Sequence, residues 1–267
     1  MLPLVTATRS GREVENGRTR PVILYCEQEN SAEEIEVYVK LRGARELTPA
    51  GLMCEGIAAL LGRDLGLPIP EPFVVEITDQ FISAIKGAAE APLFENSVGL
   101  SFGSRATYPQ FAPWSAERVM PIAMRAVAAD VFAFDAMIQN PDRRHNNPNC
   151  KVRDEELLIY DHDLAFDFLN GVLFWKPPWK PGGLDFLCGR SPTRHTFFDA
   201  LQGIPHAFDR LVDAWGKIDS TRLNGYVAAL PAEWIPAGDA PQQILGYLTD
   251  LKSHLPETIL EIRKALH

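Results

Sequence analysis

The sequence predicts an α+β fold of two lobes, a β-rich lobe over residues 1–113 and a mostly helical lobe over residues 114–267. Three observations support this prediction. Runs typical of strands, with one helix among them, fill residues 2–77, whereas apolar residues recur every three or four positions from residue 121 onward. The stretch between them, residues 88–113, is loop-like, with scattered Pro, Gly, Ser and Asn, and we expect the boundary there. A cleft between two such parts commonly holds a small-molecule site.

Three strands are expected in the first part of the chain. Residues 2–8 (LPLVTAT) and 20–27 (RPVILYCE) flank a turn-prone stretch from Ser10 to Thr19. That stretch contains Asn16-Gly17, a pair that accommodates the positive φ angles of a tight hairpin. The third run, residues 35–42 (IEVYVKLR), alternates apolar and polar residues, which is typical of a strand with one buried face.

Helices are predicted where capping residues meet a period of three to four. One begins after an N-cap at Thr48 and runs to Leu65, and Gly66 ends it before a strand over residues 73–77. The clearest helix covers residues 121–139, because five apolar residues form one stripe along it: Met124, Val127, Val131, Phe134 and Ile138. Further helices are expected near Phe197, near Phe208, and over residues 242–253 and 256–266.

Composition excludes several classes of protein. The chain has 267 residues, enough to bury its own core, and a net charge of −9, which argues against a general binder of nucleic acid or anionic membranes. No apolar run approaches the ~20 residues that span a bilayer, and the N-terminus lacks the pattern of a signal peptide. The four cysteines include no C-x-x-C pair, so neither a zinc knuckle nor a disulfide framework is indicated. We expect a cytoplasmic protein with no nucleic-acid partner.

The segment after the clearest helix contains the most informative residues. The helix must end near Asn140-Pro141, because a residue before proline resists helical geometry, and Asp142 therefore lies on a loop. Asn147 follows five positions later, and Asp161 ends the short apolar run LLIY. Phosphoryl transfer from ATP needs one carboxylate to orient the attacking hydroxyl, and an amide and a second carboxylate to hold Mg²⁺. The same D-x-x-x-x-N interval occurs in the protein-kinase catalytic loop, although turn chemistry alone also favours Asn, Pro and Asp.

Other candidate ATP contacts lie in the β-rich lobe. Lys40 is either a solvated lysine on the polar face of its strand or a lysine that reaches the ATP phosphates. Glu55, in the following helix, is either an exposed glutamate paired to Arg63 or the ion partner of Lys40. The turn that begins with Ser10 and Gly11 could cover phosphates through backbone N–H groups, but it lacks a G-x-G-x-x-G pattern. A P-loop motif is also absent from the sequence.

Several charged neighbours of these residues have more than one interpretation. Arg143 and Arg144 could neutralise phosphate charge or bind acceptor carboxylates, or either could pair with Asp154 or Glu155. Asp163 either adds a metal contact or caps the next turn. Asp135 is expected either to support the catalytic loop or to face solvent.

A metal-dependent hydrolase is the rival chemistry. Its ligands would be His145, Asp161, His162 and Asp163, since imidazole and carboxylate suit transition metals. No fixed spacing such as H-E-x-x-H supports this interpretation, and adjacent side chains on a strand point in opposite directions.

With these residues identified, the sequence resembles the HipA-like kinase family, in its compact branch, over roughly residues 5–235. VYVKLRG (37–43) resembles the strand with the ATP lysine, and the piece over residues 55–72 resembles the helix and strand after it. GLSFGSR (99–105) resembles the segment that joins the lobes. The most specific match combines the catalytic helix and loop (130–149) with the metal-binding strand end IYDHDLAF (159–166). That last piece is also similar to type II phosphatidylinositol 4-kinases.

The resemblance implies a two-lobed protein-kinase-like fold with ATP and Mg²⁺ as cofactors. Lys40 would bind the ATP phosphates, Asp142 would be the catalytic base, and Asn147 and Asp161 would ligate Mg²⁺. The usual family loop reads N-x-D-R-H, whereas here Arg144 intervenes before His145, so no role is carried over to the histidine.

The acceptor implied by the family is a protein Ser/Thr hydroxyl, with a lipid or a small metabolite as the alternative. The chain lacks the extra N-terminal module of the toxin kinases, so no antitoxin partner is implied. A catalytically silent, nucleotide-binding pseudokinase that acts as an interaction module is the non-enzymatic alternative.

Overall fold

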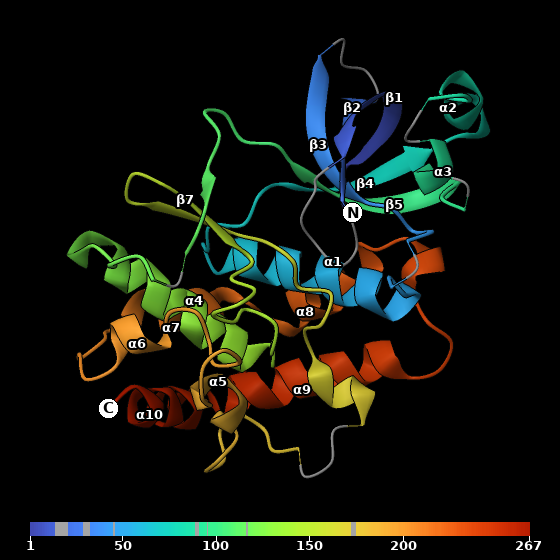
Figure 1. The fold of residues 1–267 in the computed structure, drawn as a ribbon. Helices are drawn as coiled ribbons and strands as arrows, with labels where there is room; N and C mark the ends of the chain where they lie inside the picture. The colour runs from blue at the N-terminus through green and yellow to red at the C-terminus, as the bar shows by residue number, and fades with distance from the viewer. Residues whose placement is uncertain are drawn as a thin grey trace.

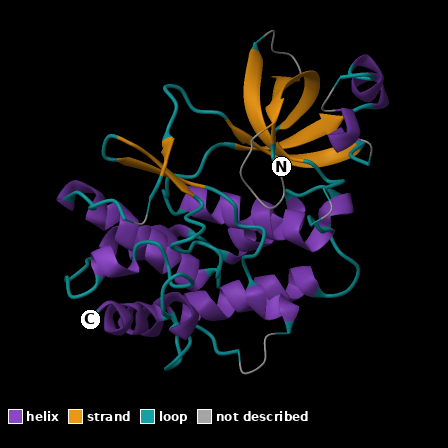
Figure 2. Cartoon of the chain, in the orientation of Figure 1, coloured by secondary structure: helices purple, strands orange, loops and turns teal. Residues whose placement is uncertain are grey.

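The computed structural model describes residues 1–13, 21–28, 33–44, 46–88, 91–94, 96–115, 117–171 and 175–267. Strands gather in the N-terminal part of the chain and helices in the C-terminal part, as Figures 1 and 2 show. The predicted α+β class, with a strand-rich part followed by a helical part, is confirmed. No helix among the described residues is long and apolar enough to cross a membrane.

The N-terminal strands close into a barrel in the order β1-β2-β3-β5-β4. They are β1 (Leu4–Glu13), β2 (Val22–Gln28), β3 (Glu34–Lys40), β4 (Pro72–Ile77) and β5 (Gly99–Arg105). β1 and β4 pair in parallel, and the other neighbours pair antiparallel. Alternate strand residues fill the barrel, among them Val37, Val39 and Val75, and the short helices α2 (Asp79–Ala84) and α3 (Ala91–Phe94) add Phe81 and Phe94 to this core.

The prediction that residues 88–113 form only loop is wrong, because β5 lies between β3 and β4. Its glycines and serines resemble a loop in composition, but the barrel requires small residues here. A Cβ on Gly103 would lie 2.5 Å from the Val75 side chain and 2.6 Å from that of Val37. Neighbouring strands already fill this space, so the small residue reflects packing and not a turn.

Ser10 and Gly11 also differ from their predicted place, because both lie within β1. Ser10 is paired with Leu24 of β2, and the register shifts between Ser10 and Glu13. A Cβ on Gly11 would lie 2.7 Å from the carbonyl oxygen of Ile23, so only glycine fits this close approach without a shift. The Asn16-Gly17 pair lies outside the described residues.

Helix α1 (Pro49–Asp64) is capped as predicted: the Thr48 hydroxyl accepts a hydrogen bond from the Gly51 N–H at 3.1 Å. Gly66 follows it with a φ of 72°. Most of its side chains are buried, and they belong to the large core of the helical part and not to the barrel core. Figure 1 shows α1 directly beneath the barrel, between it and helices of the C-terminal part such as α9.

The rest of the chain builds the helical part around α4. A 3₁₀ turn (Ile122–Met124) leads into α4 (Arg125–Met137), which confirms the clearest predicted helix. A small sheet, β6-β7-β8, follows the order of the chain. Its strands and the later helices are β6 (Ala112–Pro113), β7 (Cys150–Arg153), β8 (Glu156–Ile159), a 3₁₀ turn (Asp167–Asn170), α5 (Asp185–Cys188), α6 (Phe198–Leu201), α7 (Asp209–Lys217), α8 (Ser220–Ala228), a 3₁₀ turn (Ala232–Trp234), α9 (Ala240–Ser253) and α10 (Leu255–Leu266). The sequence pattern missed α8.

Candidate active site

Lys40, Glu55 and Asp161 come together from three different elements: β3, α1 and the turn after β8. The Lys40 ammonium lies 2.5 Å from Glu55 Oε2 and also contacts Asp161 Oδ1, and Asp163 Oδ2 lies 3.7 Å away. Lys40 and Glu55 are 9% and 2% exposed. The alternatives of a solvated lysine and an exposed glutamate are therefore wrong. Asp163 lies beside the lysine, which is not the position of a simple turn cap.

The local sequence explains how a charged pair enters this region. On β3, Val37 and Val39 point into the barrel, so the alternation directs Lys40 to the opposite side, toward α1. Glu55 is held from two sides, because the backbone N–H of His162 donates to its Oε2 at 2.8 Å. A buried carboxylate is tolerated when it is paired and hydrogen-bonded in this way.

Electrostatic interactions keep Lys40 and Glu55 charged. Burial by itself lowers the pKa of Lys40, but Glu55, Asp161 and Asp163 together raise that pKa above its ordinary value. Burial alone would raise the pKa of Glu55, yet Lys40 and the hydrogen bond from His162 bring it well below its usual range. One ammonium thus faces three carboxylates at this centre.

The loop after α4 brings Asp142 and Asn147 together. Asp142 Oδ2 accepts from the amides of Asn147 at 2.7 Å and Asn149 at 3.0 Å, and Oδ1 accepts from Arg144 at 2.6 Å. The Asp142 N–H donates to Asn140 Oδ1, as expected at a turn built from Asn, Pro and Asp. Asn147 donates to Asp142 through Nδ2. Its amide oxygen is not used in this hydrogen bond and is therefore a suitable metal ligand.

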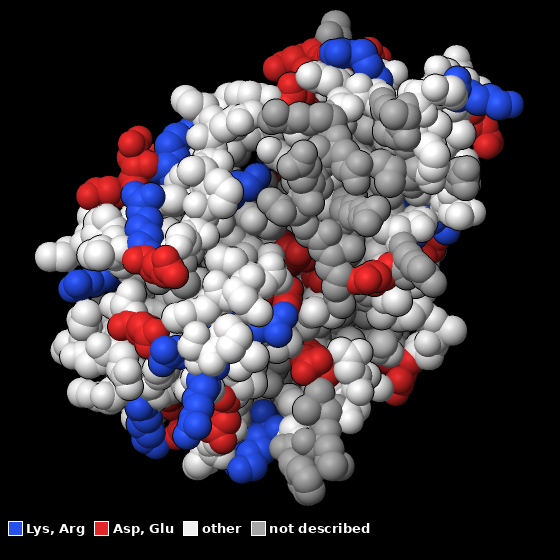
Figure 3. Space-filling view, in the orientation of Figure 1, with Lys and Arg blue, Asp and Glu red and all other residues white. Residues whose placement is uncertain are grey.

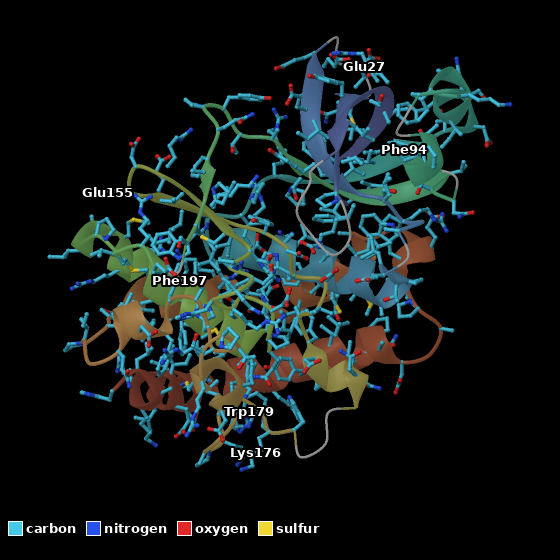
Figure 4. All side chains as sticks on the ribbon, viewed as in Figure 1. Glu27, Phe94, Glu155, Lys176, Trp179 and Phe197 are labelled. Carbon is cyan, nitrogen blue, oxygen red and sulfur yellow. The ribbon has the colours of Figure 1, made fainter. Side chains whose placement is uncertain are left out.

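Arg143 ties this loop to the Asp161 turn. Its side chain is completely buried and donates to Asp135 Oδ2 at 2.6 Å and to the carbonyls of Asn149 and Tyr160, the latter at 3.2 Å. Since Tyr160 precedes Asp161, one guanidinium holds both candidate catalytic segments. Arg143 therefore does not neutralise phosphate charge, bind acceptor carboxylates or pair with Asp154 or Glu155, and those predictions are wrong for this residue. Glu155 lies at the exposed tip of the β7–β8 hairpin, as Figure 4 shows.

Asp135 supports the loop and does not face solvent. It is fully buried and accepts from Asn140 Nδ2 at 2.8 Å and from His195 Nε2 at 3.1 Å, besides Arg143. Burial alone would raise its pKa, but Arg143 and His195 lower the pKa well below the usual range. A lone aspartate within the apolar segment Val131–Ile138 was a signal for such a buried partner.

His162 lies between the Lys40–Glu55 pair and the Arg143–Asp135 pair. Its Nε2 lies 2.9 Å from Arg143 Nη2, which can only donate, so this nitrogen accepts and Nδ1 bears the hydrogen. Nδ1 lies 3.5 Å from Glu55 Oε1. The hydrogen bond between His162 and Glu55 comes instead from the His162 backbone N–H, and through it buried contacts run from Lys40 through Glu55, His162 and Arg143 to Asp135. Sequence reasoning missed the roles of His162 and His195, because each depends on a partner distant in the sequence. It also missed Asn149, whose partner Asp142 lies on the same loop.

The backbone is strained around the same segments. Four residues other than glycine have positive φ angles here: Gln139 (51°), Asn149 (44°), Asp161 (64°) and Phe166 (59°). Such conformations cost free energy and persist where the surrounding structure enforces them, often at functional sites. Asp161 is thus held in an uncommon conformation that keeps its carboxylate on Lys40.

The available donors suit a hard cation that is shared with a substrate. Among the described residues, no group of three or more His, Cys, Asp and Glu side chains forms a metal site by itself. Asp161, Asp163 and the amide of Asn147 offer oxygen ligands. Mg²⁺ is commonly bound by one or two carboxylates plus substrate phosphates, so these residues fit that ion.

A separate cavity of about 330 Å³ lies beyond the end of α4 and has a different composition. It is lined by Gln139, Asp167, Trp175, Lys176 and Asp185, among others, and lacks the lysine and loop aspartate of the site above. Figure 4 shows Lys176 at the opposite end of the molecule from the barrel. We therefore place the candidate active site at Lys40 and Asp142 and not in this cavity.

Comparison with known proteins identifies the family. The sequence profile of the HipA-like kinases matches residues 9–171, more than half of the chain. The chain belongs to the HipA-like kinase family. The matched range contains every candidate site residue from Ser10 to Asp163, and the predicted resemblance is confirmed.

The fold of this HipA-like kinase also matches a solved structure. It is similar to the crystal structure of a Helicobacter pylori proinflammatory kinase, CtkA, with a TM-score of 0.56 and 13% sequence identity, over 98% of each chain. At that identity the similarity shows the fold alone. A search of curated proteins returned no match.

Proposed function

We propose that this HipA-like kinase binds ATP with Mg²⁺ and transfers the γ-phosphate to a hydroxyl group. The nucleotide would lie between a small N-lobe (1–113) and a helical C-lobe (114–267) of a protein-kinase-like fold. The convergence of Lys40, Glu55 and Asp161 is the observation that carries the proposal. Three carboxylates surround one ammonium there, and carboxylate oxygens are ligands that suit Mg²⁺.

Each residue has a distinct role in this proposal. Lys40 steadies the ATP phosphates and is itself oriented by Glu55, as in protein kinases. Asn147 and Asp161 hold Mg²⁺, which neutralises charge on the phosphates. Ser10 and Gly11 lie in an irregular part of β1, where backbone N–H groups could cover the phosphates.

The proposed reaction begins at Asp142. Its Oδ1 takes the proton of the acceptor hydroxyl while the acceptor oxygen bonds to the γ-phosphorus. The bond from the γ-phosphorus to the bridging oxygen breaks, and ADP leaves with that electron pair. The favoured acceptor is a protein Ser or Thr, on the strength of the family; a lipid or a small metabolite is the alternative. The four free cysteines fit the cytoplasmic location that we expect.

A silent nucleotide-binding module is the second candidate, and one observation favours it. Both oxygens of Asp142 are already occupied, Oδ1 by Arg144 and Oδ2 by two amides. If these hydrogen bonds persisted with ATP bound, Asp142 could not accept the proton of an acceptor hydroxyl. Turnover distinguishes the two candidates, because both would bind ATP.

The test is transfer of labelled γ-phosphate from ATP–Mg²⁺ to the chain itself and to a cell lysate. We expect labelling by the wild type, its loss in Asp142→Ala, and its retention in the control Asp213→Ala, which changes an exposed aspartate of α7. ATP–Mg²⁺ at ~100 times its Kd should also stabilise the wild type by about 2.7 kcal/mol. ATP binding without any transfer would establish the silent module, and neither binding nor transfer would refute both candidates.

A further inference from the structure

Arg144 is the charged side chain closest to the candidate base. Its Nη2 lies 2.6 Å from Asp142 Oδ1. The two side chains differ in exposure: that of Arg144 is 35% exposed and that of Asp142 is 12% exposed. The backbone of Arg144 is fixed, since its N–H donates to the carbonyl of Asn147 at 2.9 Å. A side chain on a fixed loop that extends toward solvent can change partners without a change in the fold.

The hydrogen bonds of Asp142 determine where an acceptor must approach. Oδ2 is held by the amides of Asn147 and Asn149, and Asn149 is buried. A hydroxyl group can therefore reach only Oδ1, the oxygen now bonded to Arg144. An acceptor that binds there, together with the phosphoryl group it attacks, must lie beside the Arg144 guanidinium.

The other described cations near this loop are already committed elsewhere. The Lys40 ammonium is surrounded by three carboxylates, and every guanidinium nitrogen of Arg143 has a buried partner. Arg194 pairs with Asp199 at 2.8 Å, and Lys151 lies over the ring of Tyr38 at 4.3 Å. Within the described part of the chain, Arg144 is thus the cation beside Asp142 whose only ion partner is Asp142 itself.

We propose that Arg144 is a catalytic residue that moves from Asp142 to the transferred phosphoryl group. This inference rests on the proposed function and adds to it. As the acceptor oxygen bonds to the γ-phosphorus and its proton passes to Asp142 Oδ1, Arg144 donates hydrogen bonds to the non-bridging oxygens of that phosphoryl group. Arg144 neither gains nor loses a proton, because a guanidinium stays charged. Cations placed where negative charge is spread in the transition state account for much of phosphoryl-transfer catalysis.

The inference also explains the departure of this loop from the usual family pattern. At the position where N-x-D-R-H has histidine, this chain has Arg144. Arginine presents a planar set of donors that matches phosphate, and its charge does not vary around neutral pH. The contact with Asp142 is then the resting state of a side chain that is required later in the reaction.

The experiment compares Arg144→Ala, Arg144→Lys and wild type in labelled phosphate transfer from ATP–Mg²⁺ to the chain itself and to myelin basic protein. We expect Arg144→Ala to lower kcat about 100-fold or more with a small change in KM for ATP, because the contact forms only in the transition state. Arg144→Lys should recover part of the rate. Millimolar guanidinium should partly restore Arg144→Ala and should not restore Asp142→Ala.

A binding measurement provides a readout that a structural role would not change. Affinity for ADP–Mg²⁺–aluminium fluoride, which mimics the transferred phosphoryl group, should fall in Arg144→Ala by a similar factor as kcat, whereas affinity for a non-hydrolysable ATP analogue should not. Arg190→Ala, which changes an exposed arginine, is the matched control. If Arg144→Ala does not fold, Arg144→Gln takes its place in both measurements.

The outcomes separate this inference from the proposed function. A wild type without ATP binding or transfer refutes the proposed function and the inference with it. An active wild type with an equally active or a faster Arg144→Ala refutes the inference alone, since the arginine would then be neutral or would only block Asp142. A slower variant that guanidinium does not restore, with unchanged aluminium fluoride affinity, makes Arg144 a structural residue and also refutes it.

Discussion

Two buried charge centres of this kinase differ in how completely their charges are balanced. At the Lys40 centre, one ammonium faces Glu55, Asp161 and Asp163, and Asp161 still contacts solvent with 20% of its side chain exposed. At the Arg143 centre, one guanidinium faces a single carboxylate, that of Asp135, and both side chains are completely buried. Counted as carboxylates per cation, the Arg143 centre is balanced and the Lys40 centre is unbalanced, and the proposed function would place Mg²⁺ at the latter.

The surface does not reveal this difference. In the face seen in Figure 3, basic and acidic side chains are intermixed and no large area of one sign stands out. The net charge of −9 is thus not concentrated in one visible patch of that face. The informative difference lies inside, where the low dielectric strengthens interactions between charges.

The largest expected effect comes from opening the balanced centre. Arg143→Leu leaves Asp135 buried without its charge partner, and we expect the free energy of unfolding to fall by about 3–5 kcal/mol. Urea denaturation measures this loss. The double variant Arg143→Leu/Asp135→Leu should be less destabilised than the single one, because no charge is then left unpaired. Equal stability of Arg143→Leu and wild type would show that the Arg143–Asp135 pair is not a scaffold.

Changing the unbalanced centre should affect activity more than folding. Asp161→Asn removes one surplus negative charge, so we expect the fold to keep its stability and phosphate transfer to fall about 100-fold. Thermal melts with and without Mg²⁺ and ATP should also show a smaller ligand-induced stabilisation. The matched control is Asp213→Asn in α7. Unchanged transfer and unchanged Mg²⁺ response would exclude Asp161 from the site.

A metal response sharpens the comparison further. Lys40→Met leaves three neighbouring carboxylates without their cation, and we expect a loss of about 1–3 kcal/mol in a chelating buffer. Millimolar Mg²⁺ should restore part of that loss, because a divalent ion can replace the missing charge. Arg143→Leu should show no such recovery. Equal Mg²⁺ responses of the two variants would contradict the assignment of the metal to the Lys40 centre.

The smallest expected effect is on the pH dependence of stability. Burial lowers the pKa of His195 despite Asp135, so the folded protein keeps this group neutral while the unfolded chain takes up a proton below about pH 6.5. The pKa values of Glu55 and Asp135 lie below the usual range, so their unfolded forms take up protons below about pH 4.5. The unfolded chain binds more protons in both ranges, and stability should therefore decrease in two stages as the pH falls.

Urea titrations between pH 7 and pH 3 measure this decrease, with the histidine stage expected first as the pH falls. His195→Gln should remove the first stage and retain the second. A stability that is constant from pH 7 to pH 5 would show that His195 titrates alike in both states.

Local signals in the sequence explain which parts of the structure could be predicted. Thr48 caps its helix by a contact three residues away, and the D-x-x-x-x-N interval places Asp142 and Asn147 on one short loop. β5 could not be predicted, because the need for a residue as small as Gly103 comes from Val37 and Val75 on other strands. The sequence indicated in which local element a residue lies, but not which distant residue it contacts in the fold.

Arg143 shows the same limit within the site. Its neighbour Arg144 has the same side chain, and the sequence offers no way to separate them. Folding buries the first against Asp135 and leaves the second partly exposed on Asp142. The distinction arises from Asp135 of α4, which lies eight positions before Arg143 and binds it.

The anchoring of α1 has a consequence for motion during turnover. Asp64 at the end of α1 accepts from Arg222 Nη2 at 2.8 Å and from the Tyr226 hydroxyl at 2.7 Å, both on α8, so this helix is fastened to the C-terminal helices. Under the proposed function, a tilt of the barrel relative to this helix would carry Lys40 away from Glu55. Breaking their ion pair would then be one step in the release of the product nucleotide.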